Sequence, residues 1–450
     1  MSLSLPGRVG RKIHDADFQI FILSVIILFT YGMYIAITTI GGGGQDNFAA
    51  ASYSNLAVNA TAAFFGFFAG GIVNYLGPRL STVISGVPFA LYTGSLLAYT
   101  QIQNSGFVIA SGALVGFGTV IMWTTQGLFS LTYPGEGSKG MSLGFFHVMY
   151  SLSGVIAGAI ALGLNFQMEN RGLTAPTYVV FIVLAVIGLA LTVLLVPAEA
   201  VRRSDQTHVQ HVHFPGWRAE LMALGRAFLN RRMLLAAPYM IITQWQAPYQ
   251  FNGYNGSLFS IRSRGANLMF YRLSSIVASL VYGHLLDKPT WTVKRRGAVA
   301  TLILVVCLVG SWIGALKVQW HYPPDEPSPY MDLSEGRYWA VWPIFVVWGF
   351  IDIGLNMTAF WLIGCFTSDT SEVSMMTGAF LAWQAIGGTI AWNIDAAGVD
   401  YRYQGIITIS AVMLGFVSLG LSVSKLPDSQ HYESKDMSNI RIAILLNVNV

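Results

Sequence analysis

Apolar segments long enough to cross a lipid bilayer recur along the whole chain, and no other feature restricts its fold so strongly. A helix needs about 20 predominantly apolar residues to span the hydrocarbon core. Such segments fall at residues 18–40, 55–76, 80–101, 106–132, 141–166, 175–196, 234–256, 265–286, 297–316, 337–363, 373–395 and 404–424. They are too long and too evenly apolar for the alternating strands of a membrane barrel. The sequence therefore predicts an all-α polytopic membrane protein with twelve transmembrane helices.

The charge content and its distribution agree with this prediction. Charged residues make up 10% of the 450 residues, whereas soluble domains carry roughly 25%. With the N-terminus in the cytosol, eighteen of the 25 Lys and Arg residues fall in cytosolic segments and six in outer segments, which follows the positive-inside rule. We therefore expect both termini in the cytosol, in either the plasma membrane or an endomembrane. The net charge of +4 reflects this topology and calls for no nucleic-acid partner.

Long polar connections predict how the chain is divided. The expected parts are a cytosolic N-terminal arm (1–17), a six-helix bundle (18–196), a cytosolic linker (197–233), a second six-helix bundle (234–424) and a cytosolic tail (425–450). Within the linker, Trp217, Leu221, Leu224 and Phe228 recur at helical spacing. This pattern is typical of an amphipathic helix on the membrane face, and the alternative is a solvated linker.

A short motif occupies the same place in both halves. The second span is followed by GGIVNYLGPR and the eighth by GHLLDKPTWTVKRRG. Each has a glycine, three residues, then Asn74 or Asp287, then a turn with basic residues. The glycine permits close helix packing, and the polar residue can accept hydrogen bonds from a neighbouring helix N-terminus. We expect these loops to form the cytosolic gate, through Gly70, Asn74, Gly77, Arg79, Gly283, Asp287 and Lys288.

These loops resemble the signature loop of the major facilitator superfamily, G-x-x-x-D-(R/K)-x-G-(R/K). The second copy keeps the glycine, the aspartate and the lysine, whereas the first has Asn74 and Tyr75 in place of the aspartate and the next basic residue. The stretches GGGGQDN, 122–160 and 249–287 are similar to those of the fungal Unc-ninety-three-like family, a branch of that superfamily. The resemblance implies two six-helix bundles around a midplane site. Some relatives resemble transporters, and others act as partners of channels or trafficking companions of receptors.

Four consecutive glycines, Gly41–Gly44, follow the first span. Glycine loses more backbone freedom on folding than any other residue, so such a run is either a flexible linker or a place where backbones approach closely. We favour close packing, because this short loop must join two adjacent helices.

Ionisable side chains inside spans are costly and indicate function. Asp352 lies near the middle of the tenth span and Arg272 lies in the eighth. We expect Asp352 to face the pathway, with Asn356 one turn away, and to take up a proton or bind a cation. The alternative is a structural ion pair with Arg272. Arg272 itself would either bind an anionic group or extend towards the membrane interface.

Other polar and aromatic side chains complete the candidate site. They are Tyr34 on the first span, Trp123 and Gln126 on the fourth, His147 on the fifth and Gln244 on the seventh. Such groups suit a weakly charged organic solute, and they also serve hydrogen bonding and packing between helices. His147 either titrates near neutral pH or packs as a neutral side chain. Pro248, Gly253 and Gly256 predict a break in the outer half of the seventh span, and broken helices often mark gates or binding sites.

Catalytic and nucleotide-binding motifs are absent from the sequence. It contains no G-x-x-x-x-G-K-(S/T), no G-x-S-x-G and no H-E-x-x-H, so we expect neither an enzyme nor an ATP-driven pump, and no cofactor. His208, His211 and His213 have a spacing that a metal could use, but no cysteine or carboxylate cluster completes a site, so no metal is expected.

Two functions remain as hypotheses. The first is a secondary transporter, embedded in the lipid bilayer, that moves a small solute across the membrane by alternating access. Transport would be coupled to a proton or another cation. The second is a non-transporting membrane partner of a channel or receptor, which the degenerate first loop, with Asn74 and Tyr75, favours.

Overall fold

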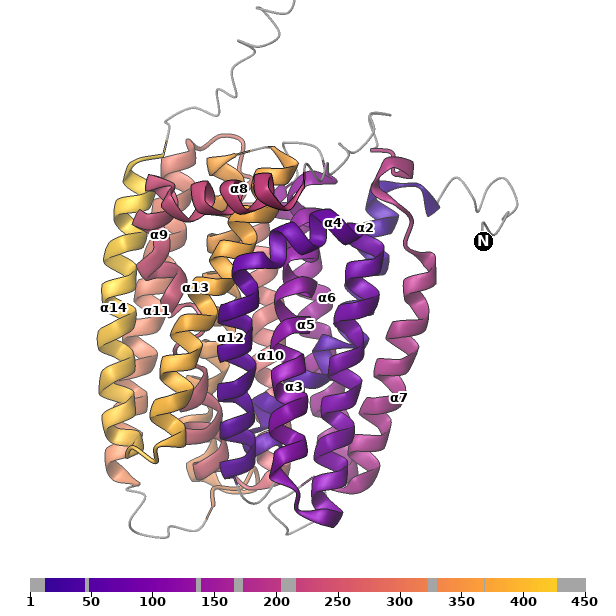
Figure 1. The fold of residues 1–450 in the computed structure, drawn as a ribbon. Coiled ribbons are helices and arrows are strands. Elements are labelled where there is room, and N and C mark those ends of the chain that lie inside the picture. The colour runs from indigo at the N-terminus through magenta and orange to yellow at the C-terminus, as the bar shows by residue number, and fades with distance from the viewer. Residues whose placement is uncertain are drawn as a thin grey trace, which may run out of the picture.

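A computed structural model describes residues 13–44, 48–134, 139–165, 173–203, 216–322, 330–367 and 369–426. The arm up to residue 12, the linker histidines His208, His211 and His213, and the tail from residue 427 lie outside these ranges. The α-helices are α2 (Ala16–Phe29), α3 (Tyr31–Ile40), α4 (Phe48–Ile102), α5 (Ser105–Thr132), α6 (Lys139–Asn165), α7 (Ala175–Leu191), α8 (Trp217–Leu229), α9 (Arg231–Ile242), α10 (Ile261–Leu286), α11 (Val293–His321), α12 (Gly336–Phe366), α13 (Thr370–Ala396) and α14 (Tyr401–Ser424). Figure 1 shows most of them standing side by side, with α8 lying across one end.

Twelve membrane crossings emerge from these helices. Eight helical stretches of the described residues are long and apolar enough to cross a bilayer. One of them contains α4, which turns back at Gly77 with φ +73° and so crosses twice (Figure 1). The other three crossings are broken or more polar: α9 with the π-helical segment Tyr249–Gly256, then α10 and α13. The predicted fold class, an all-α membrane protein with twelve transmembrane helices, is confirmed.

Two crossings are interrupted within the membrane. The first is divided at Thr30 into α2 and α3. The seventh leaves the α-helical path after Ile242 and continues as the π-helix Tyr249–Gly256. The break expected from Pro248 and the nearby glycines is therefore present, and it takes the form of a π-helix.

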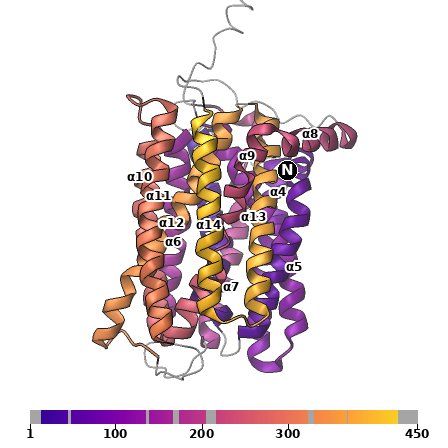
Figure 2. The ribbon, with the colours of Figure 1, turned by 90° about the vertical axis from the view of Figure 1, so that its left-hand side faces the viewer.

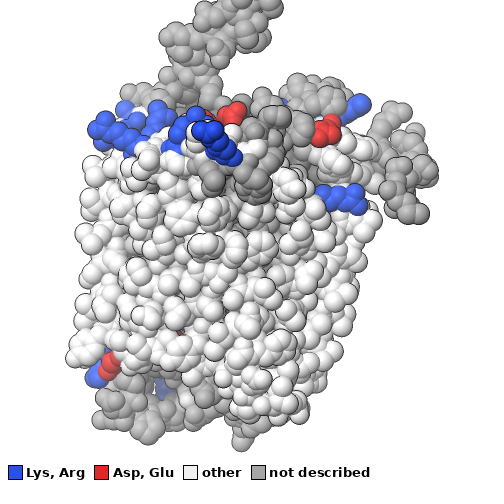
Figure 3. Space-filling view, in the orientation of Figure 1, with Lys and Arg blue, Asp and Glu red and all other residues white. Residues whose placement is uncertain are grey.

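The two ends of the molecule differ in charge. Lys and Arg side chains gather at the end that α8 crosses, which we call the basic end (Figure 3). At the opposite end, Arg262 binds Asp332 at 2.6 Å, Arg337 binds Glu335 and Arg402 binds Asp400. Pairing neutralises these three arginines, whereas Lys and Arg side chains are concentrated at the basic end.

Helix α8 connects the two bundles at the basic end. Figure 2, turned by 90°, shows it extending from the start of α9 across the end of the molecule. The Phe228 ring stacks on that of Phe67 from α4, with centroids 4.4 Å apart, and lies 5.6 Å from the Trp383 ring of α13. The linker helix therefore packs on one helix from each bundle.

Candidate functional site

A cavity of about 60 Å³ lies between the two bundles. Its polar and aromatic lining comprises Tyr31, Thr119, Trp123, His147 and Tyr150 from the first half, and Thr243, Gln244, Gln246, Gln250, Arg272, Asp352, Asn356 and Gln384 from the second. The three more polar crossings supply most of the second group. This volume holds a few water molecules but is well below the roughly 300–1,000 Å³ of typical ligand pockets. In this conformation the space at the central site is therefore too small for most organic solutes.

Arg272 and Asp352 face each other in this cavity. Nη1 of Arg272 lies 3.8 Å from Oδ2 of Asp352, which is an ion pair too long for a hydrogen bond. The arginine side chain is 1% exposed, whereas 25% of the Asp352 side chain is accessible. The guanidinium lies over the rings of Tyr150 and Tyr271, at 4.9 and 5.2 Å from their centroids. Its Nε and Nη1 have no hydrogen-bond partner, so a buried cation keeps donors free for another group.

Two glycines place this pair. A Cβ at Gly154 of α6 would lie 2.3 Å from Cγ of Arg272, so the glycine makes room for the arginine side chain. A Cβ at Gly349 of α12 would lie 2.0 Å from the carbonyl oxygen of Tyr271, so α10 and α12 meet backbone to backbone. Ser275 Oγ donates to the carbonyl oxygen of Gly349 at 2.8 Å and fixes the same contact.

Side-chain amides form the rest of the polar lining. Gln384 Nε2 donates to Thr243 Oγ1 at 2.9 Å and to Asn356 Oδ1 at 3.0 Å. Both polar atoms of the Gln246 side chain, and Nε2 of Gln250, are buried without a partner. Leaving a buried polar group unpaired costs about 1–3 kcal/mol. These groups are therefore suited to bind water or a solute.

His147 faces the cavity from α6. One ring nitrogen, Nδ1, lies 2.8 Å from the carbonyl oxygen of Leu143, and Nε2 is buried without a partner. The ring contacts Trp123 and Phe360. The side chain thus combines a packing contact with one free nitrogen at the site.

The structure brings together six of the eight residues predicted for the central site: Trp123, His147, Gln244, Arg272, Asp352 and Asn356. Tyr34 and Gln126 do not line the cavity. Tyr34 packs against Tyr31, Phe89 and Tyr92, and Gln126 Nε2 donates to Ser130 at 2.9 Å on its own helix.

Other lining residues were absent from that set of eight. Gln384 is an amide inside a span, and the rule that selected Gln244 would also have selected it. Tyr150 carries no such signal, because its sequence context does not distinguish it from a packing aromatic. It becomes visible only through its stacking beneath Arg272.

Contacts between the halves close the site towards the opposite end. Ser52 Oγ of α4, in the first half, donates to Oδ2 of Asp395 on α13 at 2.9 Å and accepts from Nδ2 of Asn252 on the π-helix at 3.2 Å. Within the second half, Asn252 Nδ2 also donates to Asp395 Oδ2 at 2.8 Å. Asn255 Nδ2 donates to the carbonyl oxygen of Thr39 at 3.0 Å. Gly41, with φ +92°, lies so close to the π-helix that a Cβ would be 2.7 Å from the carbonyl oxygen of Phe251. The glycine run therefore allows a close backbone approach.

Equivalent loops close the site towards the basic end. Asp287 accepts hydrogen bonds from the amides of Gly140 and Met141 at the start of α6, at 3.0 and 2.7 Å. In the other half, Asn74 Oδ1 accepts from Ser374 Oγ near the start of α13, at 2.9 Å. Burial raises the pKa of the Asp287 carboxyl above its usual value, and the two amide hydrogen bonds oppose that rise.

The other loop residues surround these contacts. A Cβ at Gly70 would lie 2.9 Å from the carbonyl oxygen of Ser374, and Gly283 packs on Gly140. Gly77 provides the turn through its positive φ. Lys288 Nζ lies 4.2 Å from the centroid of the Trp291 ring, and Arg79 is exposed. Glycines thus allow backbones to meet beside both polar contacts.

Asp287→Ala should increase maleimide labelling of Cys365, which lies near the basic end of α12, in a Cys307→Ser background. The substitution removes the acceptor for two amides and leaves the end of α6 less tightly held against α10. Since the chain has two cysteines, the labelling rate of purified protein reports Cys365 alone. Asp400→Ala is the matched control, because Asp400 binds Arg402 at the opposite end. Equal rates in both variants would contradict a gating role for Asp287.

Metal-ligating side chains are not clustered in the described part of the chain: no three His, Cys, Asp or Glu residues lie together there. The three linker histidines fall outside it.

Comparison with known proteins identifies the family. Residues 18–391 match the model of the Major Facilitator Superfamily. UNC93-like protein 1 of Arabidopsis thaliana is 31% identical over 411 residues, covering 90% of this chain and 89% of that protein. An UNC93-like protein of Schizosaccharomyces pombe is 29% identical over 405 residues, covering 88% and 80%. The fold resembles the crystal structure of the transporter FucP in the outward conformation, with a TM-score of 0.59, 12% identity and coverage of 90% and 97%. The chain therefore belongs to the UNC93-like proteins of the major facilitator superfamily.

Proposed function

We propose that this protein is a secondary transporter that moves a small solute across a membrane by alternating access. The observation that carries the proposal is the buried Arg272, which faces Asp352 with unpaired donors in a small cavity between two bundles. Removing a charge from water costs several kcal/mol even after relaxation. A protein that acts only through its outer surface has no use for such a site at its centre.

The chemistry of the lining favours a solute with a negatively charged or strongly accepting group. Arg272 would bind that group, and the free amides of Gln246 and Gln250 would orient the rest. The groups that face Asp352 are Arg272 and Tyr271 of α10 and Tyr150 of α6. If Asp352 takes up a proton as the anion arrives, Arg272 exchanges one partner for another and the site gains no net charge. This arrangement couples an anion to a proton.

The closing contacts would alternate during transport. Opening towards the opposite end requires Ser52 to leave Asp395 and Asn255 to leave Thr39. Opening towards the basic end requires Gly140 and Met141 to leave Asp287. Each hydrogen bond to a charged carboxylate contributes roughly 1.5–3 kcal/mol net, so each closure is within the range that binding of a solute or a proton can shift. By the positive-inside rule, we assign the basic end and both termini to the cytosol.

The rival function, a non-transporting membrane partner, draws its support from Asn74 in the first signature loop. Asn74 nevertheless accepts a hydrogen bond from Ser374, as Asp287 accepts from α6. The substitution keeps an acceptor where the gate needs one. The first loop therefore supplies less support for the rival than its sequence implied.

Proteoliposomes with an imposed pH gradient test the proposal. Purified protein is given a pool of small organic acids, and accumulation is followed by mass spectrometry. We expect at least one acid to accumulate, accumulation to stop when a protonophore collapses the gradient, and Arg272→Gln to remove it. Arg402→Gln is the matched control outside the site. No gradient-dependent accumulation by folded protein would contradict the proposal and favour the membrane-partner function.

A further inference from the structure

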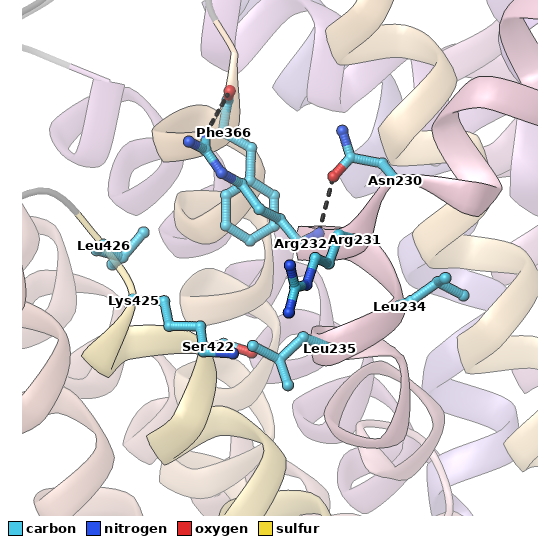
Figure 4. A pocket seen from close by; sticks show the side chains of 9 residues that line it. All are labelled: Asn230, Arg231, Arg232, Leu234, Leu235, Phe366, Ser422, Lys425 and Leu426. Atoms are coloured by element: carbon cyan, nitrogen blue, oxygen red, sulfur yellow. Dashed lines mark hydrogen bonds between the residues drawn. The ribbon is translucent and has the colours of Figure 1, made fainter.

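A second, larger pocket opens at the basic end, away from the central cavity. It has a volume of about 900 Å³ and lies where α9 begins and α12 and α14 end. Its lining includes Arg231, Arg232, Leu235, Phe366, Ser422 and Lys425 (Figure 4). Figure 4 shows Lys425 and Arg231 extending towards the space beside Ser422 from different helices. The transport proposal assigns no role to this pocket.

Positive charge in this pocket is not neutralised by the described residues. No Asp or Glu is among the residues that line it, and Arg231, Arg232 and Lys425 form no ion pair with the residues that the structure describes. The Arg232 guanidinium makes one long hydrogen bond, 3.4 Å, to the carbonyl oxygen of Phe366. Three cations thus share one concave space with most of their donors available to an anion.

The placement of the two arginines adds to the positive potential. They occupy the first turn of α9, where the helix dipole already contributes positive charge and cations are disfavoured. Asn230 caps this helix by accepting from the amide of Arg232 at 2.9 Å. The positive-inside rule explains basic residues at this end of the molecule, but it does not explain their convergence in a pocket without a counter-charge.

An apolar stripe leads from the pocket along α14. Leu421, Val417 and Leu414 precede Lys425 at helical spacing and so share its face, and they are 49%, 63% and 70% exposed. Leu234 of α9, which lines the pocket, is exposed as well. A ligand in the pocket therefore has a continuous apolar path into the membrane.

We propose that this pocket binds the headgroup of an anionic phospholipid that carries more than one phosphate, with its acyl chains along the stripe on α14. Basic pockets between transmembrane helices at the membrane surface suit such headgroups, and a volume of about 900 Å³ exceeds what a single phosphate needs. A free soluble polyphosphate has the same headgroup chemistry, but it would leave the apolar stripe without a role.

The test measures binding by the full chain in nanodiscs of neutral phosphatidylcholine. The probe is short-chain phosphatidylinositol bisphosphate carrying a fluorophore on an acyl chain, and short-chain phosphatidylcholine with the same fluorophore is the neutral comparison. We expect saturable binding of the first probe alone. The variant Arg231→Gln/Lys425→Gln should weaken it roughly 30-fold, since each basic residue at a membrane surface contributes about fivefold to affinity.

A matched variant separates the pocket from the general charge of this end. Arg218→Gln/Arg226→Gln removes two exposed arginines of α8 that do not line the pocket, and it should bind the lipid as the parent protein does. Equal losses in both double variants would overturn the proposal in favour of diffuse surface charge. Competition by soluble inositol trisphosphate at the same concentration as the lipid would overturn the lipid as the source. Because binding is measured without flux, the result is independent of the transport proposal.

Discussion

Asp352→Asn should reduce proton-driven uptake to the level of empty liposomes while the protein remains folded. Asparagine keeps the size of the side chain but cannot carry a proton between the two sides of the membrane. Arg272 would then lack the acid 3.8 Å away, so its charge would be free to hold an anion without coupling. We therefore expect exchange of labelled for unlabelled solute to persist when net uptake is lost. Uptake under a pH gradient and exchange without one are the two measurements.

Two controls define this result. Asp352→Glu retains a carboxyl group and should restore part of the uptake with an altered pH profile. Asp400→Asn, at the opposite end, should leave uptake unchanged. If Asp352→Asn took up solute as the parent protein does, the carboxyl group would have only a structural role, as partner of Arg272.

Gly349→Ala should destabilise the protein more than any other single methyl group added to α12. Its Cβ would lie 2.0 Å from the carbonyl oxygen of Tyr271, and a backbone atom cannot move aside without separating α10 from α12. Overpacking of this kind typically costs about 1–3 kcal/mol. The same shift would move Arg272 away from Asp352. We expect a lower melting temperature in detergent, measured by intrinsic fluorescence, and a lower yield of monodisperse protein.

Gly310→Ala on α11 is the control for this substitution. No atom lies within 4 Å of a Cβ at Gly310, and both changes bring the same gain in helix propensity, about 1 kcal/mol. Any difference between the two variants therefore reports the contact with Tyr271. Similar melting temperatures would show that α10 and α12 tolerate the extra methyl group.

Hydropathy was sufficient to predict the spans, because a bilayer imposes one length and one composition on every crossing helix. The helix bounds agree with expectation to within a few residues at most ends, as for α5 (Ser105–Thr132) against 106–132. Charge inside a span was sufficient to select Arg272 and Asp352, because such residues are costly in lipid. Both signals depend on residues that are close together along the chain, so they can be read from a single sequence.

Which side chains face each other across helices depends on tertiary packing, so these contacts could not be predicted from the sequence. Asp395 lies at the end of a predicted span, yet its role in closing the site depends on Ser52 and Asn252, which come from distant segments. Tyr34 and Tyr31 lie one turn apart, and only the packing of α3 against α4 places Tyr31 alone at the cavity. Proline and glycine predicted a break in the seventh span, but not that it would be a π-helix.

The π-helix Tyr249–Gly256 can change its hydrogen-bonding pattern to that of an α-helix without leaving the membrane span. Its hydrogen bonds run from each residue to the fifth one along, and a change to the fourth would rotate everything beyond it about the helix axis. Asn252 and Asn255 would turn together away from Ser52 and Thr39, so one backbone transition would release two contacts between the bundles. Such a change would separate the bundles at the end opposite the basic end, while the seventh crossing stayed helical. Faster amide exchange at residues 249–256 during turnover would reveal it, and exchange unaffected by solute would exclude it.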